Sequence, residues 1–326
     1  MIFWFSLLIV ITLIIFSATS LNYTENTVMK NSIDYTTKLI RQLNRDIDSY
    51  IDYMENISDM VVNGGEVSEI LFEEDAVEKE QLYSRIITQF NTVVETREDI
   101  SNIGVITQDN QYIINGGDDR LNENIHLNDV DWYYRAMQTE GSVLTASHVQ
   151  QVIQNNYKWV VTLSKGIIDP NTGKNGAVFF IDLNYKLLKD LCENNSLAKN
   201  SYVFIVDESG KIIYHPKQQL LYSGLKVERI EEVLACDNSY FVIHEDGADK
   251  LYTVQVSDKT GWRVVGVADF SELKKSQKET QELYIYTAIL IFLAAILLAT
   301  LLAATITKPI KRLMDSMKEV EKGNFE

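Results

Sequence analysis

The sequence is poor in the residue types that build catalytic, metal and disulfide sites. Its 326 residues include four histidines, three prolines and two cysteines. Cys192 and Cys236 allow one disulfide in an oxidising compartment, but their spacing fits no metal or redox motif. Neither a Gly-x-Ser-x-Gly nor a His-Glu-x-x-His pattern occurs. We therefore predict no catalytic residue, metal ligand or cofactor, and we expect that this chain is not an enzyme.

Positive charge is also scarce. Lysine and arginine number 30 against 46 aspartates and glutamates, which gives a net charge of −16 at pH 7. An acidic surface repels the phosphate backbone, so nucleic acid is excluded as a partner. Solubility is the simplest explanation of the excess acid, and binding of cationic ligands is the alternative. The few prolines and the lack of low-complexity tracts predict that the polar part of the chain is well folded.

Two long apolar runs without charge lie near the ends of the chain, at 2–17 and 284–306. A helix needs about 20 apolar residues to cross the hydrocarbon core of a bilayer. The sequence therefore predicts transmembrane helices at 1–20 and 284–306, with the lipid bilayer as a partner. A cleaved signal peptide is the alternative for the first run, because small residues follow it at 17–20.

The charges beside the second run predict its orientation. Lys308, Lys311 and Arg312 follow it closely. Lysine and arginine next to a span stay in the cytoplasm. We therefore expect a two-pass protein whose residues 21–283 lie outside the cell and whose tail lies inside.

The stretch at 21–65 is predicted to be one long stalk helix. Its apolar residues recur at steps of three and four and so share one face. They are Ile33, Ile40, Leu43, Ile47, Ile51, Met54, Ile57 and Val61. This stripe suits a spine on which an outer domain packs. It also suits pairing with a second copy of the chain, so we expect a homodimer.

The remaining exterior is predicted to form two strand-rich modules, at 66–192 and 193–270, followed by a connecting helix at 271–283. Alternating or continuous apolar runs separated by turn residues indicate strands. They lie at 100–107, 111–115, 142–149, 157–168 and 176–183 in the first module, and at 202–206, 211–214, 240–244, 251–256 and 262–268 in the second. Helices are expected at 77–95, 129–138, 184–192 and 227–234. Both modules therefore belong to the α+β class, with antiparallel sheets and helices on one face.

Several patterns in this order resemble the double Cache sensor family of bacterial receptors. They are DWYYRA at 131–136, GAVFFIDL at 176–183, VDESGKIIYHP at 206–216 and GWRVVGV at 261–267. The resemblance covers about 21–270 and implies two PAS-like modules, one distal to the membrane and one proximal. It also implies a bacterial plasma membrane and an extracellular small-molecule ligand.

The tail at 307–326 resembles the first half of a HAMP signal-relay module, most like that of Gram-positive sensor histidine kinases. Its apolar residues Ile310, Leu313, Met317 and Val320 fall on one helix seam. Pro309 suits the first turn of that helix.

In the family, ligands bind the distal module between the sheet and its covering helix, which here implies Trp132, Tyr133 and Asp182 as ligand contacts. Aromatic rings supply apolar area, and a buried carboxylate can hold an amine. Arg135 and His148 lie in the same region. Core packing of the aromatic rings and a helix cap at Asp182 are the alternatives.

Family members that bind amino acids carry an arginine two residues before the tryptophan and an aspartate on the following strand. In this sequence the first position is Val130, and no aspartate occurs around 148–150. An α-amino acid ligand is therefore doubtful, and another amine, a sugar or a peptide remains open.

These features predict a transmembrane receptor that relays ligand binding through the second span and the HAMP-like segment to a histidine kinase output beyond this chain. The alternatives are the sensor region of a chemoreceptor or of a diguanylate cyclase. A membrane-tethered exterior enzyme and an adhesion module are weaker alternatives.

Overall fold

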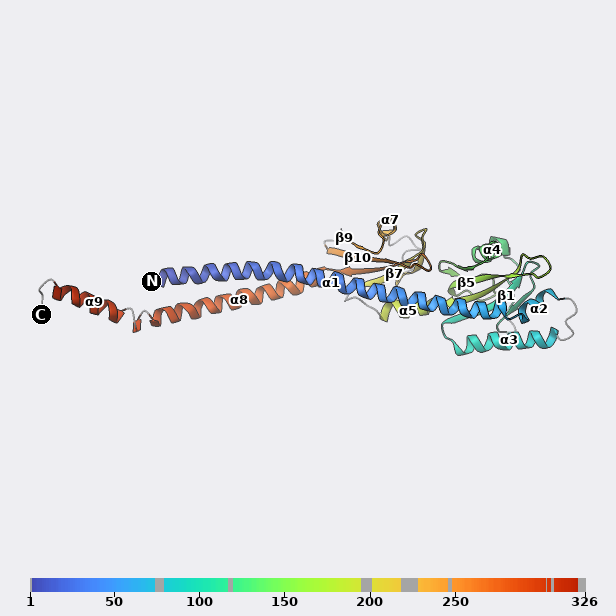
Figure 1. Cartoon of the computed structure of the whole chain (residues 1–326), viewed down its shortest axis with the longest axis horizontal. Helices are drawn as coiled ribbons and strands as arrows, with labels where there is room; N and C mark the ends of the chain where they lie inside the picture. Colours follow the sequence, from blue (N-terminus) through green and yellow to red (C-terminus); the bar gives the residue numbers. More distant parts are fainter. Residues whose placement is uncertain are drawn as a thin grey trace. The chain divides into compact units, whose positions relative to one another are not determined.

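The computed structural model is shown in Figure 1. It describes residues 2–73, 79–116, 120–194, 201–217, 228–245, 248–302, 304–305 and 308–321. The chain divides into two compact units. One unit is Ile33–Asp269, and the other combines Met1–Ser32 with Phe270–Glu326. Each unit is described by itself.

The first sheet of the Ile33–Asp269 unit is antiparallel throughout. Its strands are β1 (Ile100–Thr107), β2 (Tyr112–Ile114), β3 (Ser142–Leu144), β4 (His148–Val149), β5 (Trp159–Ile168) and β6 (Asn175–Asn184). They lie in the order β2-β1-β6-β5-β3, with β4 also paired to β5. The long strands β5 and β6 form the centre, and most of their side chains are buried.

The second sheet repeats this arrangement. Its strands are β7 (Tyr202–Val206), β8 (Ile212–Tyr214), β9 (Tyr240–Glu245), β10 (Ala248–Val256) and β11 (Arg263–Asp269). Their order is β8-β7-β11-β10-β9, and all neighbours are antiparallel. In both sheets the second strand lies at one edge, the first strand is next to it, and the last strand is central. The predicted α+β class with a long N-terminal helix and two antiparallel sheets is thus confirmed.

The helices fall close to their predicted positions. They are α1 (Ile2–Asn63), α2 (Glu66–Phe72), α3 (Lys79–Thr96), α4 (Asp131–Gln138), α5 (Tyr185–Asn194) and α7 (Ile230–Leu234), with a 3-10 turn η1 (Leu127–Asp129) before α4. Helix α2, which begins after Gly65, was not predicted from the sequence. The backbone of Gly65 has a φ of 80°, a conformation that glycine adopts without strain.

Helix α1 is the spine of the Ile33–Asp269 unit (Figure 1). Ile40, Leu43, Ile47, Ile51 and Met54 are fully or almost fully buried. They belong to one hydrophobic cluster that takes in side chains of the first sheet, of the second sheet and of α3. Because the same apolar stripe serves both sheets, a single continuous core joins the two modules.

Polar contacts fix the register of α1 against the turns of the sheets. Lys259, in the turn before β11, pairs with Asp52 at 2.5 Å and with Glu55 at 2.6 Å. On the first sheet, Lys165 forms an ion pair with Asp59. Together these ion pairs join α1 to both sheets.

The basis of the homodimer prediction does not hold in this structure. The stripe expected to pair with a second copy is covered by the chain's own sheets from Ile40 to Met54. A helix face that is already buried cannot serve as a dimer seam. The homodimer therefore stays a prediction without that support.

The predicted strand at 142–149 is interrupted. β3 ends at Leu144 and β4 starts at His148, and the residues between them leave the ladder. The backbone N–H of Thr145 still bonds to the carbonyl of Thr162 at 3.1 Å. The hydroxyl of Ser147 instead donates to the carbonyl oxygen of Ile212 in the second sheet, at 3.2 Å. The interrupted segment thus contacts the neighbouring module as well as its own sheet.

The second unit contains α8 (Ser271–Leu302) and α9 (Lys308–Glu321). Within the described residues, one helix segment is long and apolar enough to cross a membrane, Glu282–Leu301 in α8. It matches the predicted span at 284–306. The first predicted span is helical in the structure, but most of its side chains lie outside the described residues, so that span stays a prediction.

The HAMP-like tail also stays a prediction. α9 is a helix with Pro309 in its first turn, and Ile310, Leu313 and Met317 are exposed along it. This is the seam that the sequence predicts, but it has no partner helix among the described residues. Cys192 and Cys236 are both free thiols, so the structure contains no disulfide between them.

Removing one side chain from the shared core tests the spine. Ile47 is 1% exposed, and we expect Ile47→Ala to lower the free energy of unfolding by about 2–5 kcal/mol, because the truncation leaves a cavity. Chemical unfolding followed by circular dichroism measures this. Met60, on the same helix, is 77% exposed, and Met60→Ala should change stability by less than about 0.5 kcal/mol. Equal effects of the two variants would contradict the assignment of the buried face.

Candidate functional site

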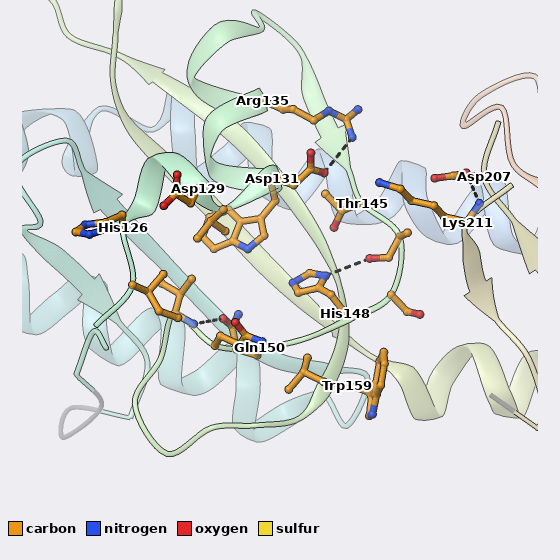
Figure 2. Close-up of a pocket in the computed structure, with 18 of the residues that line it drawn as sticks. His126, Asp129, Asp131, Arg135, Thr145, His148, Gln150, Trp159, Asp207 and Lys211 are labelled. Carbon is orange, nitrogen blue, oxygen red and sulfur yellow. Dashed lines mark hydrogen bonds and ion pairs between the residues drawn. The ribbon is translucent and has the colours of Figure 1, made fainter. Parts of the chain in front are cut away.

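A cavity of about 710 Å³ opens beside α4 in the first module (Figure 2). Its wall has four parts: an exposed segment before α4, the first turns of α4, the segment from Thr145 to Val152, and the hairpin between β7 and β8. The residues that carry polar groups on this wall include Asn124, His126, Asp129, Asp131, Arg135, Thr145, Ser147, His148, Gln150, Gln151, Asp207 and Lys211. The volume lies within the range of small-molecule sites.

Helix α4 is held against the sheet by its aromatic face. The ring of Trp132 lies 5.0 Å from that of Phe180 on β6, and the hydroxyl of Ser164 on β5 donates to the Trp132 carbonyl at 3.0 Å. Trp132 is 2% exposed and still lines the cavity. Its indole nitrogen is buried without a hydrogen-bond partner among the described residues. Core packing therefore applies to Trp132, and its role as a ligand contact stays a prediction.

Arg135 lies one turn further along α4, on the cavity side. Its guanidinium faces Asp131 at 3.5 Å, and both side chains are about half exposed (Figure 2). The distance is long for a hydrogen-bonded ion pair. Most of the five N–H donors of Arg135 are thus open to a further partner.

His148 lies on the wall where the interrupted strand passes. Its Nδ1 is 3.1 Å from the carbonyl oxygen of Ala146, and its Nε2 is 3.3 Å from the hydroxyl of Thr162. Figure 2 shows the ring near Thr145, and His148 lines the cavity. The imidazole is therefore held at both nitrogens and presents its edge to the cavity.

Asp182 lies beneath the cavity instead of on its wall. The register of the sheet places Asn102 and Thr162 directly opposite Asp182 on the two neighbouring strands. Thr162 donates to its carboxylate at 2.6 Å and Asn102 at 2.8 Å, and the amide of Gln150 donates as well. The carboxylate is therefore surrounded by donors and shielded from any ligand.

Burial raises the pKa of Asp182 above its ordinary value near 3.8, because the charged form loses its hydration. The three hydrogen bonds act in the opposite direction and offset part of this rise. The side chain is fully buried. We conclude that Asp182 acts on the cavity through Gln150, which lines it.

Two expectations about this region need correction. Tyr133 does not line the cavity: it is 1% exposed and packs in the cluster between α4 and the sheet. Burial raises the pKa of Tyr133 to about 12, with a smaller contribution from Asp109. The alternative of a helix cap at Asp182 is also wrong, because the side chain that accepts from the first turn of α5 is Asn184, at 3.0 Å from the Lys186 N–H.

The second module contributes to the site, which the sequence did not predict. The β7–β8 turn brings Asp207 and Lys211 to the cavity wall. The Asp207 carboxylate accepts from the backbone N–H groups of Ser209 and Lys211, both at 2.8 Å. Gly210 takes a φ of 84°, which favours glycine. The turn is thus rigid, and Figure 2 shows the Lys211 side chain extending from it into the cavity.

The chain belongs to the Cache domain family. The family model matches residues 24–277, which cover both sheets. The resemblance seen in the sequence is thereby confirmed over this range.

Relatives of known name are bacterial chemotaxis receptors. The chain is 25% identical over 198 residues to the methyl-accepting chemotaxis protein McpA of Bacillus subtilis, and 22% identical over 217 residues to McpB of the same organism. These alignments cover 60% and 67% of this chain. They cover 28% of McpA and 32% of McpB, so the chain spans about a third of the length of these relatives.

Solved ligand-binding domains of chemoreceptors share the fold. That of Campylobacter jejuni Tlp3, in complex with 4-methylisoleucine, has a TM-score of 0.58 and 13% identity, and the match covers 76% of this chain and 94% of that one. That of Mlp24, with asparagine, has a TM-score of 0.58 and 15% identity, with 78% and 99% covered. At this identity the likeness establishes the architecture alone.

The buried carboxylate makes a testable contribution to stability. Because the pKa of Asp182 is raised in the folded state, the folded protein holds a proton that the unfolded chain has released above about pH 4. The stability of the wild type relative to Asp182→Asn should therefore fall as the pH rises above about 4, and then level off once Asp182 is ionised in the folded state.

Urea unfolding of both proteins between pH 4 and 8 measures this difference, in which the titration of all other groups cancels. A difference that rises with pH over this range would show that the hydrogen bonds outweigh desolvation and that the pKa is lowered.

Proposed function

We propose that this chain is the sensor region of a transmembrane receptor and that an extracellular small molecule binds in the cavity beside α4. The observation that carries the proposal is the cavity itself, which combines an aromatic wall with converging polar groups in a Cache domain. Such a combination is typical of small-molecule sites. No group of three or more metal-ligating side chains occurs within the described residues, and the proposal needs none.

The named relatives favour a chemoreceptor output over a histidine kinase. The matched proteins are described as methyl-accepting chemotaxis proteins, and the solved structures as chemoreceptor domains. The resemblance of the tail to sensor histidine kinases rests on the HAMP-like segment alone. We therefore place chemotaxis signalling first and the kinase second.

Ligand binding would act by shifting populations. A ligand that prefers one arrangement of the exterior biases the receptor by its difference in affinity for the two states. β11 ends at Asp269, and α8, which carries the candidate span, begins two residues later. The last strand of the second sheet is therefore directly connected in sequence to the membrane segment.

The contacts of Asp182 argue against an amine as the ligand. An amine ligand was expected because a carboxylate on the pocket floor could hold an ammonium group. In the structure that carboxylate already accepts from three side chains and does not reach the cavity. Several neighbouring structures contain amino acids, such as Tlp3 with L-valine. This chain has Val130 in place of the arginine that grips an α-carboxylate, so we propose a small polar ligand that is held differently.

A screen with a blocked cavity tests the site. The full chain in lipid nanodiscs is screened by thermal shift against amino acids, organic acids, amines, sugars and nucleosides. Gln151 is exposed and lines the cavity, whereas Gln154 is exposed and does not. We expect Gln151→Trp to abolish the ligand-induced rise in melting temperature by filling the cavity, and Gln154→Trp to retain it. If no compound class shifts the wild type, or if both variants respond equally, the cavity is not the sensing site.

Labelling of intact cells tests the topology. Lys174 lies in an exposed turn of the first sheet, and Lys311 is exposed on α9. In a Cys236→Ser background, Lys174→Cys should react with a membrane-impermeant maleimide and Lys311→Cys should react only after cell lysis. The reverse pattern would place the Cache domain inside the cell and exclude an extracellular sensor.

A further inference from the structure

Two cations from different modules meet at one cavity. Arg135 comes from α4 of the first module, and Lys211 comes from the first hairpin of the second module. In Figure 2 the Lys211 side chain reaches toward the turn of α4 that carries Asp131 and Arg135. The two residues are 76 positions apart in sequence, and only the packing of one module on the other brings them together.

The position of Lys211 follows from contacts on both sides of it. Its own N–H bonds to Asp207 and fixes the turn. The next residue, Ile212, accepts the hydrogen bond of Ser147 from the cavity wall. Lys211 is thus placed beside the wall by a rigid hairpin and a direct contact between modules. Its ammonium group forms no ion pair with any described residue.

The acidic groups at this end of the wall each already have a partner. Asp207 is occupied by the N–H groups of its own turn, and Asp131 faces only Arg135. The third acid, Asp129, lies next to His126, whose carbonyl accepts the Asp129 N–H. Figure 2 shows this pair at the other end of the cavity from Lys211. The Arg135 end of the cavity therefore carries two cations and two carboxylates, Asp131 and Asp207, and each of these carboxylates already has a partner within its own helix or turn.

We propose that the ligand is a small carboxylate whose anionic group binds between Arg135 and Lys211, so that one ligand group joins the two Cache modules. The inference rests on the proposed function and names the ligand class and the residues that select it. Charge-assisted hydrogen bonds from a guanidinium and an ammonium suit a carboxylate. They also replace the weak 3.5 Å contact of Arg135 with a stronger one.

The arrangement gives the ligand a way to alter the receptor. At the cavity wall the modules are joined by the neutral hydrogen bond from Ser147 to Ile212. A carboxylate between Arg135 and Lys211 adds charge-assisted bonds that exist only when the modules are in this arrangement. The ligand therefore favours this arrangement over any in which the β7–β8 hairpin is displaced.

The test uses carboxylates of two to six carbons, each paired with its neutral amide, together with phosphate monoesters and diamines of similar size. Thermal shift and calorimetry are measured on the full chain in nanodiscs. We expect at least one carboxylate to bind and its amide not to bind. Lys211→Ala and Arg135→Ala should each weaken binding about tenfold or more, and Lys211→Arg should retain it. Both side chains are exposed, so neither change should unfold the protein.

The control and the double variant make the result specific. Lys174→Ala removes an exposed lysine that does not line the cavity and should leave affinity unchanged. If one carboxylate contacts both cations, the double variant should lose less affinity than the product of the two single losses. The inference is overturned if binding prefers amides, phosphates or diamines, or if no carboxylate binds. It is also overturned if Lys211→Ala binds the carboxylate as well as the wild type does. In each case a ligand found by the wider screen would still support the receptor function.

Discussion

Burial of one apolar stripe on α1 is the constraint on which the rest of the structure depends. The five residues from Ile40 to Met54 lie in a core shared by both sheets. Each sheet alone would leave its inner face open to water, and the stripe covers both. Because one helix packs against both sheets, the two modules keep a defined relative position. The β7–β8 hairpin therefore reaches the wall of the first module's cavity.

Much of the fold could be predicted from sequence because it depends on local periodicity. The three- and four-residue steps from Ile33 to Val61 gave the spine, and apolar runs bounded by turns gave the strands. The break after Leu144 and the contact of Ser147 with Ile212 could not be predicted, since the apolar pattern at 142–149 carries no sign of a neighbouring module. The pairing of the stripe with a second copy was an equally good interpretation of the sequence, and only tertiary packing excludes it for the buried part.

The candidate site, like the fold, could be predicted from the sequence only in part. Trp132, Arg135 and His148 were predicted and line the cavity. Alternation along β6 places Asp182 on the same face as Phe180, which faces α4, so the side of the sheet was predicted correctly. It could not show that Asn102 and Thr162 lie opposite this carboxylate and occupy it. Lys211 was not predicted, because no local sequence pattern shows which module a hairpin packs against.

The exposed segment just before α4 is a place where changes in sequence can alter which ligand the cavity prefers. Asn124, His126 and Asp129 line the cavity, yet the described part of this segment forms no strand of the sheet, and its isolated bridge joins Leu121 to Ile153 in the loop before β5. Lengthening an irregular surface loop costs little in chain entropy. Insertions and substitutions in this segment can therefore change which ligand the cavity prefers, in evolution or by design. The sheets and the core that stabilise the fold are not altered by such changes.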